Sequence, residues 1–167
     1  MSTTPTPHVV VGVVLGQPAA VARTAATFAD RFGADLVCAC VDPARYPLTH
    51  DVDRPDLSVP VDPDLLDLPG PGLRPALETM LSEHLRGLDV RWSVRALAGG
   101  PARELARLAD ELDAAMIVVG TREAGLRESL RELVNGSVAA HLAHRQHRPV
   151  LVVPLAPAPA RQDQPSA

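Results

Sequence analysis

The sequence predicts an α/β protein with a doubly wound, three-layer, five-stranded parallel sheet. Short apolar runs rich in valine alternate along the chain with segments in which apolar residues recur at helical spacing. Runs without polar alternation are typical of parallel strands that are buried on both faces. A length of 167 residues, with 46% hydrophobic and 22% charged residues, fits one globular domain.

The first strand is predicted over residues 8–15, the following helix over 19–31 and the second strand over 36–41. Pro18 suits the first turn of a helix, and Gly33 suits its C-terminal cap. The helix carries one apolar stripe at helical spacing, which consists of Val21, Ala25, Phe28 and Phe32.

Residues 42–75 differ from the rest because eight of them are proline. Prolines at this density prevent regular backbone hydrogen bonding, so this Pro-rich insertion is predicted to be a long irregular loop. Loops of this length are either functional or disordered. Arg45 and Tyr46 follow a strand end, where they would be within reach of a ligand.

The second half of the chain continues the alternation. A helix over 75–88 is followed by an alternating strand over 90–97, which is typical of a half-exposed edge strand. A helix over 102–112 and strands over 116–119 and 150–153 complete the pattern. Right-handed crossovers then place helices on both faces of the sheet.

We predict one domain over residues 8–154, with flexible tails at 1–7 and 155–167. The net charge is -4, aromatics make up 2%, and no basic cluster stands out, which disfavours nucleic-acid partners. No apolar run approaches the roughly 20 residues that span a membrane, and no signal peptide is recognisable, so a cytoplasmic location is expected.

The strand–loop–helix–strand pattern of residues 116–154 is the most informative about function. Its first strand stops at Gly120, and Gly136 and Ser137 stand at the start of an alanine-rich helix. In parallel sheets, ligands bind at the loops that leave the carboxyl ends of the strands. Glycines admit a close approach to the backbone, and a helix N-terminus offers free N–H groups to an anion.

At this point the chain resembles the universal stress protein family over residues 9–154. The likeness is carried by Val11-Gly12-Val13, Gly100-Pro101-Ala102 and residues 117–122, 135–139 and 148–154. It implies an adenine nucleotide alpha hydrolase-like fold with strand order 3-2-1-4-5. It also implies a homodimer formed through the last strand, which consists of Val150, Leu151, Val152 and Val153.

Some members of that family bind ATP, so the resemblance implies a regulatory module in the stress response with ATP, together with Mg²⁺, as its ligand. The positions that it assigns to a nucleotide follow strands one, two and four: Val13, Val14, Val41, Gly120, Thr121, Arg122, Gly125, Gly136, Ser137 and Val138. The ATP-binding members carry Gly, two residues, Gly, nine residues, and then Gly with Ser or Thr, and they usually have an Asp at the end of the first strand. This chain departs from that pattern in three ways. Glu123 replaces a glycine, the span to Gly136 is longer, and Val14 replaces an aspartate.

Two other functions remain open from the sequence. In the first, the glycines only turn a loop and cap a helix, and the protein is a dimeric interaction module with an unidentified protein partner and no nucleotide. In the second, it is a slow ATPase, which is disfavoured because no general base or pair of metal ligands is evident. No catalytic residue and no metal site is predicted.

Three further groups of residues have plain structural explanations. His141, His144 and His147 have no acidic or cysteine companions, which favours a solvent or dimer-interface role over metal binding. Cys38 and Cys40 point to one face of a strand and are predicted to be core residues. Residues 126–134 read as a short amphipathic helix that packs locally.

Overall fold

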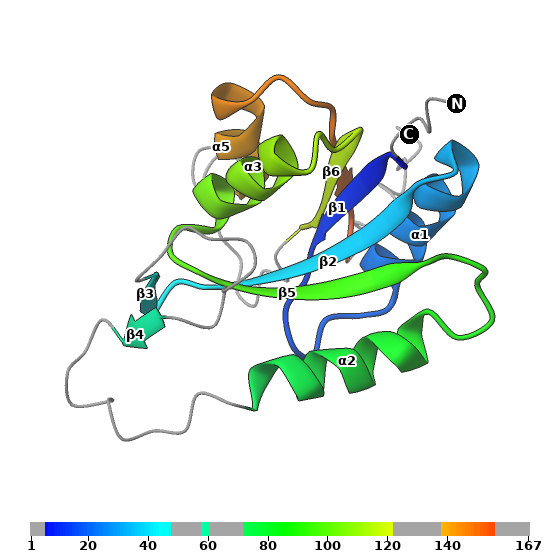
Figure 1. The fold of residues 1–167 in the computed structure, drawn as a ribbon, viewed down its shortest axis with the longest axis horizontal. Helices are drawn as coiled ribbons and strands as arrows, with labels where there is room; N and C mark the ends of the chain where they lie inside the picture. The colour runs from blue at the N-terminus through cyan, green and yellow to red at the C-terminus, as the bar shows by residue number, and fades with distance from the viewer. Residues whose placement is uncertain (1–5, 48–57, 61–71, 122–137, 156–167) are drawn as a thin grey trace, which may run out of the picture.

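The computed structural model describes residues 6–47, 58–60, 72–121 and 138–155. A five-stranded parallel sheet with the order β5-β2-β1-β6-β7 runs between two layers of helices (Figure 1). Counted along the chain, these strands have the predicted order 3-2-1-4-5. The elements are β1 (His8–Gly12), α1 (Ala20–Phe32), β2 (Asp35–Asp42), β3 (Arg45–Pro47), β4 (Ser58–Pro60), α2 (Leu73–His84), β5 (Trp92–Ala98), α3 (Pro101–Glu111), β6 (Met116–Gly120), α5 (Val138–Arg145) and β7 (Val150–Val153).

The valines of β1 supply both halves of the core because successive strand residues point to opposite faces. Val9 and Val11 pack into the cluster beneath α1 and α2, whereas Val10 packs into the cluster beneath α3 and α5. All three are fully buried. This two-sided burial explains why β1 and β6 read as unbroken apolar runs in the sequence, and it confirms the predicted layers.

Several predicted boundaries shift. The first strand ends at Gly12 rather than at residue 15, because the chain turns immediately afterwards. The second helix spans Leu73–His84 rather than 75–88. Phe32, the last residue of the predicted apolar stripe, is 50% exposed, because Val21 and the alanines of α1 form the face against the sheet. Within the described part of the chain, no helix is long and apolar enough to cross a membrane.

The Pro-rich insertion holds a small regular element, which the irregular-loop prediction missed. Strands β3 and β4 form an antiparallel pair in which Pro47 lies opposite Ser58 and Arg45 lies opposite Pro60. Both prolines stand at strand ends, where a missing N–H costs little of the ladder. The rest of the predicted loop, at 48–57 and 61–71, lies outside the described residues.

Candidate functional site

The sheet has one topological switch point, which lies between β1 and β6. These strands are neighbours, with Val11 paired to Val118. The chain leaves the carboxyl end of β1 for α1 on one face of the sheet, whereas α5, the next described helix after β6, lies on the other face (Figure 1). The two connections therefore diverge at this point, and the space beyond the carboxyl ends of such strands is where α/β proteins bind ligands.

The loop after β1 is a tight turn on the rim of this site. The Gln17 N–H donates to the Val14 carbonyl at 3.2 Å, and Gly16 has φ +77°. A positive φ at the third turn position is typical of a type II turn and favours glycine. Val13 is buried and its N–H donates to the Ala39 carbonyl, whereas Val14 is 55% exposed. The turn thus presents an apolar side chain where the resemblance leads one to expect a carboxylate.

Gly120 lies under side chains from three other segments. A Cβ at this position would come within 2.7 Å of Gln17 Nε2, 2.9 Å of Val21 Cγ2 and 3.3 Å of Leu155 Cδ1. Real Cβ atoms do not approach other atoms below 3.0 Å. Packing within the protein is therefore enough to require glycine at position 120, whether or not a ligand binds.

Gln17 was not among the residues predicted for this site. Its signal was local: it stands one residue after the glycine of a turn that follows a predicted strand. Its side chain joins the two loops of the switch point, because Oε1 accepts from the Val14 N–H at 3.3 Å while Nε2 lies over Gly120.

Thr121 links the end of β6 to the residues after β7. Its N–H donates to the Val153 carbonyl at 2.9 Å, and its hydroxyl oxygen accepts from the Leu155 N–H at 2.9 Å. Four of the positions assigned to a nucleotide therefore lie at the carboxyl ends of two neighbouring strands: Val13 and Val14 follow β1, Gly120 ends β6, and Thr121 follows it.

The other assigned positions are more dispersed. Val41, at the end of β2, and Val138, the first residue of α5, pack partly buried against the α3–α5 half of the core. The remaining assigned positions, Arg122, Gly125, Gly136 and Ser137, lie outside the described residues. Glu123 and the predicted helix at 126–134 lie outside them as well.

A buried carboxylate on α3 was also missed. Glu104 is 1% exposed, and its two oxygens accept from Arg103 Nε at 3.0 Å and Arg107 Nε at 2.9 Å. Both arginines are more accessible to solvent than the glutamate. Glu104 is thus held in ion pairs in the first turn of α3, beside Gly99, a structural role that agrees with its i,i+3 spacing to Arg107.

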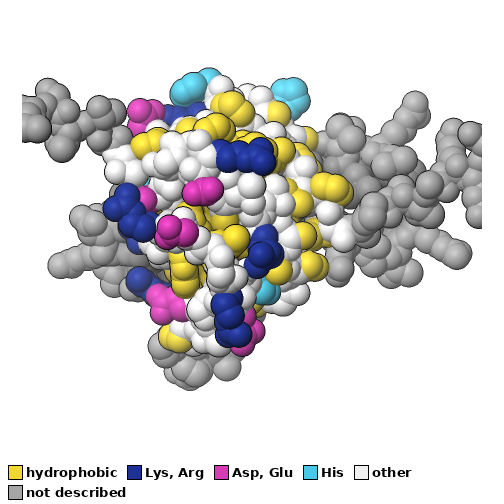
Figure 2. All heavy atoms as spheres, turned by 90° about the vertical axis from the view of Figure 1, so that its right-hand side faces the viewer, with side chains coloured by type: hydrophobic (Ala, Val, Ile, Leu, Met, Phe, Trp, Pro, Cys, Tyr) yellow, Lys and Arg dark blue, Asp and Glu magenta, His cyan; other side chains and the backbone are white. Residues whose placement is uncertain are grey.

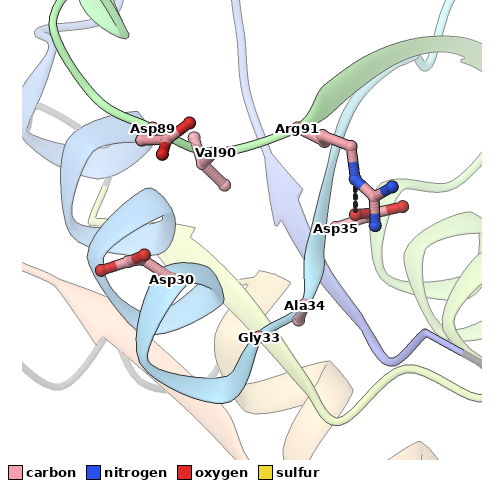
Figure 3. Close-up of a pocket in the computed structure, with 7 residues that line it drawn as sticks. All are labelled: Asp30, Gly33, Ala34, Asp35, Asp89, Val90 and Arg91. Atoms are coloured by element: carbon pink, nitrogen blue, oxygen red, sulfur yellow. Dashed lines mark hydrogen bonds and ion pairs between the residues drawn. The ribbon is translucent and has the colours of Figure 1, made fainter.

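A surface hollow of about 240 Å³ lies at the opposite end of the strands, before β2 and β5 (Figure 3). Asp30, Asp35 and Asp89 are among its lining residues, and Asp35 accepts from Arg91 Nε at 2.8 Å. Three carboxylates against one guanidinium disfavour a phosphate ligand. The hollow is therefore a poorer candidate for a nucleotide than the carboxyl edge.

Charges on the surface are mixed in sign. Figure 2 shows arginines and acidic residues interspersed on the face that forms the right-hand side of Figure 1. His141, His144 and His147 are exposed. Among the described residues, no group of three or more His, Cys, Asp or Glu side chains is placed to hold a metal.

Cys38 and Cys40 are buried core residues, as predicted. Burial raises the pKa of the Cys38 thiol to about 12, and burial followed by the charge of Asp42 raises the pKa of Cys40. We expect negligible reaction of the native protein with a thiol reagent at pH 8, and two equivalents after denaturation. Since folding raises the pKa of Cys38, the contribution of this thiol to stability is present below pH 9.0 and is lost as the pH rises towards about 12. Rapid labelling of the native protein would contradict the buried placement.

The model of the universal stress protein family matches residues 6–154, which is nearly the whole chain. The chain belongs to the universal stress protein family. Solved universal stress proteins share its fold. One in complex with cAMP is 21% identical with a TM-score of 0.61, and the match covers 92% of this chain and 100% of the other. UspA from Lactobacillus plantarum is 20% identical with a TM-score of 0.61, and the match covers 90% and 99%.

A third solved universal stress protein, from Archaeoglobus fulgidus in complex with dAMP, is 22% identical with a TM-score of 0.55, and the match covers 89% of this chain and 97% of the other. A search of curated sequences finds no significant match. The family and the doubly wound fold predicted from the sequence are thus confirmed.

Proposed function

We propose that this universal stress protein is a regulatory module that binds an adenine nucleotide beyond the carboxyl ends of β1 and β6. The observation that carries the proposal is the meeting of the two loops at the switch point, where Gln17 of the first loop lies against Gly120 of the second. In doubly wound sheets this is the place where nucleotides bind.

Two further considerations support an adenine nucleotide. Structural neighbours of this chain have been solved with cAMP and with dAMP. In the sequence, Gly136 and Ser137 keep the last part of the glycine pattern of the ATP-binding members. We propose ATP with Mg²⁺ as the ligand, a signalling role in the stress response rather than catalysis, and action in the cytoplasm.

A second candidate is a homodimeric interaction module that has no nucleotide. It is favoured by the packing around Gly120, which explains that glycine without any ligand. In the described sheet, β7 is an edge strand whose only neighbour is β6, and Val152 is 42% exposed. An edge strand of this kind can pair with a second copy of itself. Val153 is buried in the protein's own core and would contribute only its backbone.

Thermal denaturation with and without ATP and Mg²⁺ separates the two candidates. A ligand at about 100 times its Kd stabilises the folded state by about 2.7 kcal/mol, so binding should raise the melting temperature by several degrees. Gly136→Asp places a negative charge at a position that the family resemblance assigns to the nucleotide, and it should abolish this shift while leaving the ligand-free melting temperature close to that of the wild type. The interaction module predicts no shift in either protein.

A further inference from the structure

One hydrogen bond orients the side chain of Gln17 at the switch point. Its Oε1 accepts from the Val14 N–H at 3.3 Å. An amide nitrogen cannot accept this hydrogen bond, so the contact determines which end of the carboxamide faces Gly120. The end that faces Gly120 is the donor, Nε2.

The turn that carries Gln17 positions this donor towards Gly120. The Val14–Gln17 turn is closed by its own hydrogen bond at 3.2 Å and requires glycine at position 16. The oxygen of the carboxamide is anchored to the same turn. Within the described part of the chain, the Gln17 side chain makes no other hydrogen bond, so Nε2 retains its capacity to donate.

The chemistry of the turn selects what Nε2 can bind. Val14 offers an apolar side chain, so the exposed rim of this loop supplies an amide donor and no carboxylate acceptor. A donor without a competing negative charge suits an anionic oxygen, and hydrogen bonds to charged groups are stronger than neutral ones. A carboxylate at this place would repel such an oxygen.

We propose that Gln17 is a ligand-contacting residue whose Nε2 donates a hydrogen bond to a phosphate oxygen of the nucleotide at Gly120. This inference rests on the proposed function and adds a specific contact to it. It also predicts that the loop after β1 contacts the phosphate group of the ligand rather than a sugar hydroxyl.

Gln17→Glu removes the donor and places a negative charge where the phosphate oxygen would bind, while it keeps the size of the side chain and an oxygen to accept from the Val14 N–H. The affinities of the wild type and the variant for AMP and for adenosine are measured by calorimetry. We expect AMP binding to weaken by about tenfold or more, and adenosine binding to change by less than about twofold. Ser82→Glu adds the same charge on α2 and should leave both affinities unchanged. Unaltered melting of both variants establishes that they fold.

The outcomes separate the two claims. Equal AMP affinity in the wild type and Gln17→Glu would overturn the contact and leave the proposed function standing. Equal losses for AMP and adenosine would also overturn it, because they would reflect a distorted turn rather than a lost phosphate contact. Failure of the wild type to bind AMP, ADP or ATP would overturn the proposed function itself.

Discussion

Gly120→Ala is expected to lower the free energy of unfolding by about 1–3 kcal/mol in the absence of any ligand. The new methyl group would lie 2.9 Å from Val21 Cγ2 and 2.7 Å from Gln17 Nε2. The Gln17 amide ends a flexible side chain and can move at small cost. Val21 is β-branched and fully buried on α1, so the helix or the strand must shift instead. Urea denaturation monitored by circular dichroism measures the loss.

Gly72→Ala is the matched control for this variant. A Cβ at Gly72 meets nothing within 4 Å, and its backbone is already in the right-handed helical region with φ -88°. We expect a change within about 0.5 kcal/mol. If both alanine variants were equally stable, the close packing of β6 against α1 at Gly120 would be refuted.

Arg148→Met is expected to destabilise the protein by about 1–3 kcal/mol. The Arg148 side chain is only 9% exposed. Its Nε donates to the Ala114 carbonyl at 2.8 Å, and its terminal nitrogens pair with Asp110 and with Asp113. The guanidinium thus ties the segment before β7 to the turn between α3 and β6. Methionine keeps much of the apolar length but leaves the Ala114 carbonyl without this partner.

An exposed arginine provides the comparison for Arg148. Arg74 pairs with Glu78 one helical turn away, and both side chains are about half exposed at 48%. Such surface pairs contribute about 0.5 kcal/mol or less, so Arg74→Met should be nearly neutral. Similar losses in the two variants, measured by urea denaturation, would show that the contacts of Arg148 contribute no more than a surface pair.

The sheet could be predicted from the sequence because its central strands β1 and β6 are buried on both faces and read as unbroken apolar runs. The run at residues 150–153 is bounded by two prolines, and β7 has those bounds. The helices and their buried faces were harder to predict, since alanine indicates a core position only weakly. In α1 the alanines, rather than Phe32, form the buried face. A three-residue strand such as β3 has no periodicity to detect, which is why the hairpin was missed.

The candidate site was predictable in outline and not in detail. Gly120 could be found because it is a glycine at the end of a predicted strand. Sequence spacing alone does not reveal which neighbouring side chains occupy the space beside its Cα. Gln17 reaches Gly120 across a turn and from a neighbouring strand, so their contact depends on tertiary structure. Glu104 was missed for a similar reason: a glutamate between arginines on a helix is usually solvent-exposed, and here the carboxylate is buried.

Calorimetric titration of the nucleotide-free protein with ATP and Mg²⁺ tests the central claim most directly. We predict saturable binding at one site per chain with a Kd in the micromolar range, about -8 kcal/mol. An absence of binding heat at two temperatures, with ATP raised to millimolar concentration, would contradict nucleotide binding. The packing of Gln17 over Gly120 would then serve only the fold, and the edge strand β7 would become the surface to study.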